Sequence, residues 1–125
     1  MNFLICTIVR NRAQRLPMWE QQLTDLVEAC PNDYFELSVY ENDSEDNSAE
    51  MLGTAFDYAG FEHVRIMNER LNTPYFGSVQ DMDRVQLLAN ARNNCLDYPN
   101  LTKFDKIIFV EPDVQYETSQ ALEIM

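Results

Sequence analysis

The 125-residue sequence contains few of the residues that mark repetitive or disordered chains. It has three glycines and five prolines, and 46% of its residues are apolar while 24% are charged. These proportions exclude collagen-like, elastin-like and disordered proteins and are typical of a globular chain. The length fits a single domain over residues 1–125, which is large enough to bury a hydrophobic core.

Positive charge is also scarce. Nine lysines and arginines stand against 21 aspartates and glutamates, which gives a net charge of -12. A field of this sign repels phosphate backbones and anionic lipid headgroups, so we expect no nucleic-acid partner and no stable membrane insertion. An anionic small ligand fits this charge only where a local arginine or a bound divalent cation reverses the sign.

Cysteine and histidine are too few for a zinc site or a catalytic triad. Cys6, Cys30 and Cys95 lie far apart, and His63 is the single histidine and has no serine or cysteine partner pattern. We interpret the cysteines as buried thiols of a reducing compartment. Residues 2–9 lack the features of a signal peptide and are too short to span a bilayer, so we expect a soluble, cytoplasmic protein.

Apolar runs and helical periodicities alternate along the chain. In the run at residues 35–40, apolar residues alternate with Glu36 and Ser38. Ser48 is expected to cap the helix that follows this run, and Gly60 is expected to end it. Strands alternating with helices predict an α/β fold, a Rossmann-like α/β/α sandwich with a mainly parallel sheet. Strands are predicted at residues 3–9, 35–40, 64–67 and 106–110, and helices at residues 16–30, 48–59 and 79–96.

Polar clusters follow three of the predicted strands, at residues 10–12, 41–43 and 111–113. In an open parallel sheet, ligands bind outside the carboxyl ends of the strands, where the loops gather. We therefore expect one arginine cluster and two carboxylate clusters to converge at that edge.

Glu111 and Asp113 are candidate metal ligands. They are two residues apart, and in an extended backbone such side chains project to the same side. Two carboxylates that face a cleft repel each other unless a hard cation lies between them, and Mg²⁺ and Mn²⁺ favour oxygen ligands together with substrate phosphates. The pair predicts a Mn²⁺ or Mg²⁺ site or, as the alternative, an exposed acidic turn.

The acidic segment from Glu41 to Asn47 is similar to the start of an EF-hand calcium loop, but the count fails. Ser48 would stand in place of glycine at position six and Thr54 in place of glutamate at position twelve. Glu41, at the end of a strand, is better interpreted as an acceptor of hydrogen bonds from a nucleoside base or ribose. A simply solvated loop is the alternative.

Arg92 is expected on the apolar side of the predicted helix at residues 79–96. An arginine on a buried face is costly unless it is paired, so it should meet a phosphate or a carboxylate. A structural ion pair with Glu41 or Asp113 is therefore as acceptable as a ligand-binding role, and Arg10 faces the same choice.

Three segments resemble a known family when they are taken together. Residues 40–48 (YENDSEDNS) look like the Y-E-x-x-S-x-D-x-T/S stretch of GT-A glycosyltransferases. Residues 84–96 (RVQLLANARNNCL) look like the R-x-x-x-L-A-x-x-R-N-x-x-L helix of the fungal capsule-associated α-1,3-mannosyltransferases, and residues 104–114 are similar to the strand and D-x-D-type motif that close this half of the fold. The segments lie in the family's order.

This resemblance implies the nucleotide-binding half of a GT-A glycosyltransferase that moves a sugar from a nucleotide donor, GDP-mannose by the nearest likeness, to a glycan or other hydroxyl acceptor. Glu111 and Asp113 would hold Mn²⁺ or Mg²⁺ on the diphosphate, and no catalytic base is assigned. The metal would act as a Lewis acid for the leaving diphosphate. The candidate donor-binding residues are Thr7, Arg10, Glu41, Asp43 and Arg92.

Two other function classes fit the length and the alternation of elements. A receiver domain of the flavodoxin-like type would carry an acidic pair after the first strand, where this chain has Arg10-Asn11-Arg12. A non-catalytic interaction module, or a degenerate remnant, on the transferase fold would be folded and have no affinity for nucleotides.

Overall fold

The computed structural model of the chain describes residues 1–72, 82–98 and 100–125, so the predicted helix start at residues 79–81 lies outside the described residues. The strands are β1 (Asn2–Val9), β2 (Tyr34–Asn42), β3 (His63–Glu69) and β4 (Lys106–Phe109). The helices are α1 (Leu16–Glu28), α2 (Ser48–Thr54), α3 (Met82–Cys95) and α4 (Thr118–Ile124), with a 3₁₀ turn at Leu101–Lys103. All the predicted strands and helices are present, with shifted ends.

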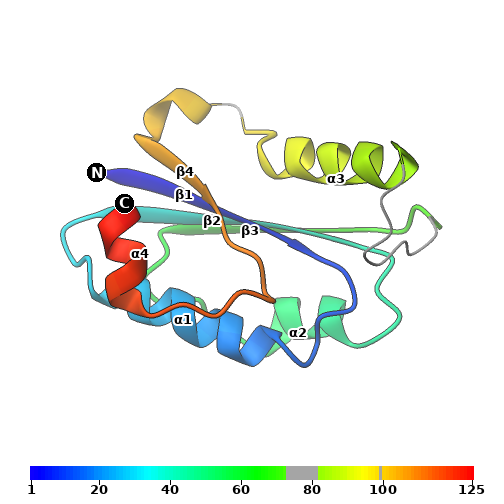
Figure 1. Cartoon of the computed structure of the whole chain (residues 1–125), viewed down its shortest axis with the longest axis horizontal. Coiled ribbons are helices and arrows are strands. Elements are labelled where there is room, and N and C mark those ends of the chain that lie inside the picture. The colour runs from blue at the N-terminus through cyan, green and yellow to red at the C-terminus, as the bar shows by residue number, and fades with distance from the viewer. Residues whose placement is uncertain (73–81, 99) are drawn as a thin grey trace.

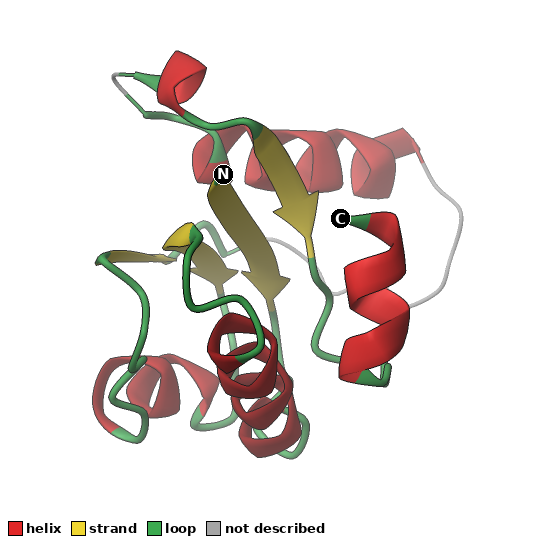
Figure 2. Cartoon of the chain, turned by 90° about the vertical axis from the view of Figure 1, so that its left-hand side faces the viewer, coloured by secondary structure: helices red, strands yellow, loops and turns green. Residues whose placement is uncertain are grey.

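The strands form a parallel sheet in the order β3-β2-β1-β4. Helix α3 covers one face, and α1, α2 and α4 lie on the other (Figure 1). The view turned by 90° shows the strands between α3 on one side and α1 and α2 on the other (Figure 2). The predicted α/β sandwich with a parallel sheet is therefore confirmed.

Strand β1 is the centre of the core because its side chains alternate between two buried layers. Phe3, Ile5 and Val9 pack toward α1, in the cluster that includes Trp19. On the opposite face, Leu4 and Cys6 pack with Tyr40, Ala91 and Cys95. This burial on both faces explains why β1 is a continuous apolar run.

The prediction that all three cysteine thiols are buried is confirmed for two of them. Cys6 and Cys95 are buried and Cys30 is half-buried, and all three are free. Among the described residues, no helix combines the length and the apolar character that crossing a bilayer requires.

Strand β2 is covered on both faces, so the predicted polar side of this strand is wrong. Glu36 and Ser38 are as buried as their apolar neighbours. The Glu36 carboxylate accepts a hydrogen bond from the Tyr34 hydroxyl (2.8 Å) and forms an ion pair with Lys103. These partners compensate the loss of hydration that makes a buried carboxylate costly.

Helix α2 ends at Thr54, five residues before the predicted end. The chain leaves the helix so that Phe56 and Tyr58 reach the ring of Trp19, each with its ring centroid 6.3 Å from that of the indole. Ser48 is not the cap that was predicted, because Asn47 occupies the N-cap position and makes no side-chain cap.

Contrary to the prediction, helix α3 does not turn Arg92 toward the sheet. Ala91 and Cys95 are buried, whereas Val85 is 53% exposed and Arg92 is also exposed. Small residues let the helix lie close to the sheet over Tyr40, and this contact turns Arg92 away from the core. The prediction that Arg92 lies on the apolar side of the helix is therefore wrong.

Candidate functional site

The carboxyl ends of β1 and β4 form the switch point of the sheet. The chain runs from β1 outward to β2 and β3 and then returns to β4 on the other side of β1. In open α/β sheets the crevice at such a reversal is the usual ligand site. The loops after β1 and β4, which contain residues 10–12 and 111–113, lie at this reversal.

A left-handed residue shapes the loop after β1. Asn11 has a φ of 54°, a conformation that asparagine tolerates better than most residues. Its backbone N–H donates to the Ser44 hydroxyl (3.0 Å), and its side-chain oxygen accepts from the Glu45 N–H (2.6 Å). The loop is thus tied to the loop that follows β2.

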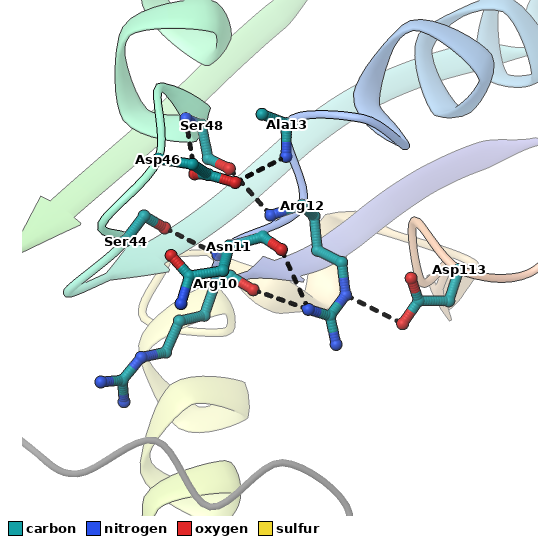
Figure 3. Close-up of polar contacts among 8 residues, drawn as sticks. All are labelled: Arg10, Asn11, Arg12, Ala13, Ser44, Asp46, Ser48 and Asp113. Atoms are coloured by element: carbon teal, nitrogen blue, oxygen red, sulfur yellow. Dashed lines mark hydrogen bonds and ion pairs between the residues drawn. The ribbon is translucent and has the colours of Figure 1, made fainter.

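Arg12 connects the two sides of the switch point. Its Nε donates to Asp113 Oδ2 (2.9 Å), while its Nη1 donates to the carbonyl oxygens of Arg10 (3.0 Å) and Asn11 (3.1 Å). Its backbone N–H donates to the Ser48 hydroxyl (2.9 Å). Figure 3 shows Arg12 reaching toward Asp113, whereas the side chain of Arg10 points away from it, toward the side of α3.

Asp46 connects the loop after β1 to the start of α2. Its carboxylate accepts hydrogen bonds from the backbone N–H of Ala13 (3.1 Å) and of Ser48 (3.0 Å) (Figure 3). Burial acts to raise the pKa of Asp46, but the hydrogen bonds from Ser48 and Ala13 together lower it below its usual value. The folded loops therefore favour the ionised carboxylate.

Of the two carboxylates predicted to bind the donor, Glu41 lies near the end of β2 and Asp43 directly after it, and both are buried. Glu41 is 3% exposed, and its Oε2 accepts from the Ser44 N–H (2.8 Å). Asp43, with a φ of 52°, accepts from the N–H groups of Leu71 (2.8 Å) and Asn72 (3.0 Å). Both carboxylates organise loops at this edge, and their donor-binding roles stay predictions.

Thr7 is buried near the carboxyl end of β1. Its hydroxyl donates to the Val110 carbonyl oxygen (2.8 Å) and accepts from Nε1 of Trp19 (3.1 Å). Arg92 lies on the other side of the sheet, with its guanidinium carbon 6.0 Å from the centroid of the Phe109 ring at the end of β4. The structure therefore does not bring Thr7 and Arg92 together.

The backbone around Glu111 and Asp113 differs from the extended one expected. The Val114 N–H donates to the Glu111 carbonyl oxygen (3.2 Å), which closes a turn with Pro112 buried between the two exposed acids. Because of this turn, the i and i+2 rule for strands does not apply here. Among the described side chains, no group of three or more His, Cys, Asp or Glu could hold a metal ion.

A pocket of about 330 Å³ opens beside the switch point, between α3 and the ends of β2 and β3. Sequence reasoning missed it, although Asn90, Asn93 and Asn94 have the i, i+3, i+4 spacing that places side chains on one helix face. Its described lining residues are Tyr40, Asn42, Glu69, Leu71, Leu87, Asn90, Asn93 and Asn94.

Tyr40 and Glu69 lie together in the lining of this pocket. The Tyr40 hydroxyl donates to Glu69 Oε2 (3.0 Å), and Tyr40 is 2% exposed. Burial, and then the hydrogen bond to Glu69, raises the pKa of Tyr40 to about 12. Tyr40 thus remains a hydrogen-bond donor at neutral pH and holds one carboxylate oxygen of Glu69 in place.

A family model described as cryptococcal mannosyltransferase 1 matches residues 2–125. Since this match covers nearly the whole chain, the chain belongs to that family, as the motif resemblance predicted. No curated protein and no solved structure matches the chain.

Proposed function

We propose that this member of the cryptococcal mannosyltransferase 1 family binds a nucleoside diphosphate sugar, with GDP-mannose as the first donor to test, and transfers its sugar to a hydroxyl acceptor. The observation that carries the proposal is the guanidinium of Arg12, held by Asp113 across the switch point of the sheet. The family match supports glycosyl transfer as the chemistry.

The loop at residues 10–12, called the arginine loop below, supplies the positive charge that an anionic ligand needs in a chain with a net charge of -12. Arg10 and Arg12 lie in one short loop at the switch point, and a guanidinium fork matches the oxygens of a phosphate. Arg12 is pre-ordered, because two backbone carbonyls and Asp113 already orient it. Such ordering lowers the entropy cost of holding a diphosphate.

Glu111 and Asp113 offer oxygen ligands that suit a hard cation such as Mn²⁺ or Mg²⁺. Both are exposed, but Asp113 is paired with Arg12, so phosphate oxygens and water would have to complete the coordination shell. A cation bound there would neutralise charge on the leaving diphosphate. Arg12 would stabilise the same developing charge from the opposite loop.

Calorimetric titration with GDP, UDP and GDP-mannose, each with and without Mn²⁺, tests this proposal. Exchanging Arg12 for glutamine should weaken binding at least tenfold and leave the chain folded, because the Arg12 to Asp113 ion pair is partly exposed and contributes about 0.2–1 kcal/mol. Exchanging the exposed Arg15 for glutamine removes the same charge at the start of α1, away from Asp113, and should change affinity less than threefold. A folded chain that binds none of these ligands would favour the interaction-module alternative.

A further inference from the structure

We propose that Glu69, oriented by Tyr40, is the residue that reads the donor's base in the pocket beside α3 and that it discriminates guanine from uracil. This inference rests on the proposed donor-binding function. It differs from the role that the motif resemblance implies for Glu41, whose carboxylate is 3% exposed and already bonded to the backbone N–H of Ser44.

The charge of the pocket decides which part of a donor it can take. Glu69 is the one acid among its described lining residues, and none of them is basic. A phosphate would be repelled there, in a chain that is already strongly acidic. The pocket therefore suits a neutral group that presents N–H donors.

The orientation of Glu69 suits one base edge in particular. A carboxylate only accepts hydrogen bonds, and Tyr40 already holds its Oε2. Guanine presents its N1–H and its exocyclic N2–H side by side, so both can donate to this carboxylate. Uracil presents one N–H flanked by two carbonyl oxygens. A carboxylate placed at that edge therefore faces at least one carbonyl oxygen, whose partial negative charge it repels. Such unpaired or repelled groups are an effective source of specificity.

The remaining walls complement a purine. The carboxamides of Asn90, Asn93 and Asn94 supply N–H donors that can meet the O6 and N7 acceptors of guanine. Leu71 and Leu87 supply apolar surface for the flat faces of the ring. A volume of about 330 Å³ lies at the small end of ligand pockets, which suits a base with part of its ribose.

The pocket and the arginine loop lie at the same end of neighbouring strands. Val9 pairs with Glu41 in the β1 to β2 ladder, so Arg10 follows β1 beside Asn42, which lines the pocket. The Arg10 side chain points toward the side of α3 (Figure 3), and the pocket lies between α3 and the ends of β2 and β3. A base in the pocket would therefore direct its ribose and phosphates toward this loop.

Titration of the folded chain with GDP, UDP and ADP in the presence of Mn²⁺ tests the inference. We expect GDP to bind at least ten times more tightly than UDP. Exchanging Glu69 for glutamine should weaken GDP at least tenfold and change UDP less than threefold, because the base edge is affected and the phosphates are not. Glu62→Gln, an exposed glutamate just before β3, is the matched control and should change neither. Circular dichroism checks the fold of each variant.

Two results would overturn the inference while leaving donor binding intact: equal affinity for GDP and UDP, or an equal loss of both in the Glu69 variant. Competition of methyl α-mannoside with GDP would also overturn it, because the pocket would then hold the sugar. Binding of no nucleotide at all would remove the proposed function itself. If the Glu69 variant fails to fold, Asn90→Leu replaces it, because Asn90 lines the same pocket and is exposed, and this variant should weaken GDP selectively.

Discussion

The hydroxyl of Thr7 provides the sharpest test of the structure, because one buried and one half-buried partner depend on it. It donates to the Val110 carbonyl oxygen at 2.8 Å and accepts from the Trp19 indole N–H at 3.1 Å. Exchanging Thr7 for valine keeps the shape of the side chain and removes both hydrogen bonds. Trp19 is 1% exposed, so its N–H would lose its partner in a dry environment.

The expected loss of stability follows from these contacts. An unsatisfied buried donor costs about 1–3 kcal/mol. The half-buried Val110 carbonyl adds up to about 1 kcal/mol, since water can reach it in part. Valine favours strands and returns about 0.5 kcal/mol. We therefore expect a net loss of about 2 kcal/mol, and at about 3–6 °C per kcal/mol a fall in Tm of about 9 °C.

Urea denaturation followed by circular dichroism measures this loss, and a double-mutant cycle assigns it. In a Trp19→Phe background the orphaned N–H is gone, so Thr7→Val should cost about 1–3 kcal/mol less than in the parent chain. A loss below about 0.5 kcal/mol in the parent chain, or no coupling with Trp19, would refute the reasoning. A loss of GDP affinity without a loss of stability would instead support Thr7 as a donor-binding residue.

Two further predictions concern stability. Gly60 has a φ of 88°, and a Cβ there would lie 2.5 Å from Val27 Cγ1, so Gly60→Ala should cost about 2–4 kcal/mol in urea denaturation. Gly53→Ala, where nothing lies within 4 Å, should instead stabilise α2 by about 0.5–1 kcal/mol, and equal effects at the two glycines would contradict this account. The lowered pKa of Asp46 means that its carboxylate stabilises the fold above its unfolded pKa of about 3.9 and that this contribution disappears as the pH falls through the folded pKa. The stability difference between the parent chain and Asp46→Asn, measured by urea titration, should therefore shrink between pH 5 and pH 2, and a difference independent of pH would disprove the assignment.

Part of the fold could be predicted because hydrophobic periodicity reports local conformation. Residues 3–9 read as a buried strand and form one, and the alternation of strands and helices indicated the parallel sheet. The predictions failed where packing competes with local pattern. Helix α3 turned its Ala91 face to the sheet, and α2 stopped at Thr54 so that later aromatic residues could reach Trp19.

The candidate site was also predictable from the sequence only in part. The acids and arginines at the strand ends were recognisable as a polar cluster, and their gathering at one edge follows from the parallel arrangement. Their partners were not recognisable. Glu41 and Asp43 bond to backbone N–H groups of loops, and such groups are identical in every residue, so no sequence pattern marks them.

By itself, the sequence determined the strand and helix types, the family and the sign of the charge, because each depends on residue identity and local spacing. Only the tertiary structure decided that β4 lies beside β1, which brings Arg12 to Asp113 across 101 positions of the chain. It likewise decided that Glu69 and the asparagines of α3 share one pocket. Strand order and helix rotation are set by the burial of side chains distant in sequence, and local periodicity does not encode that choice.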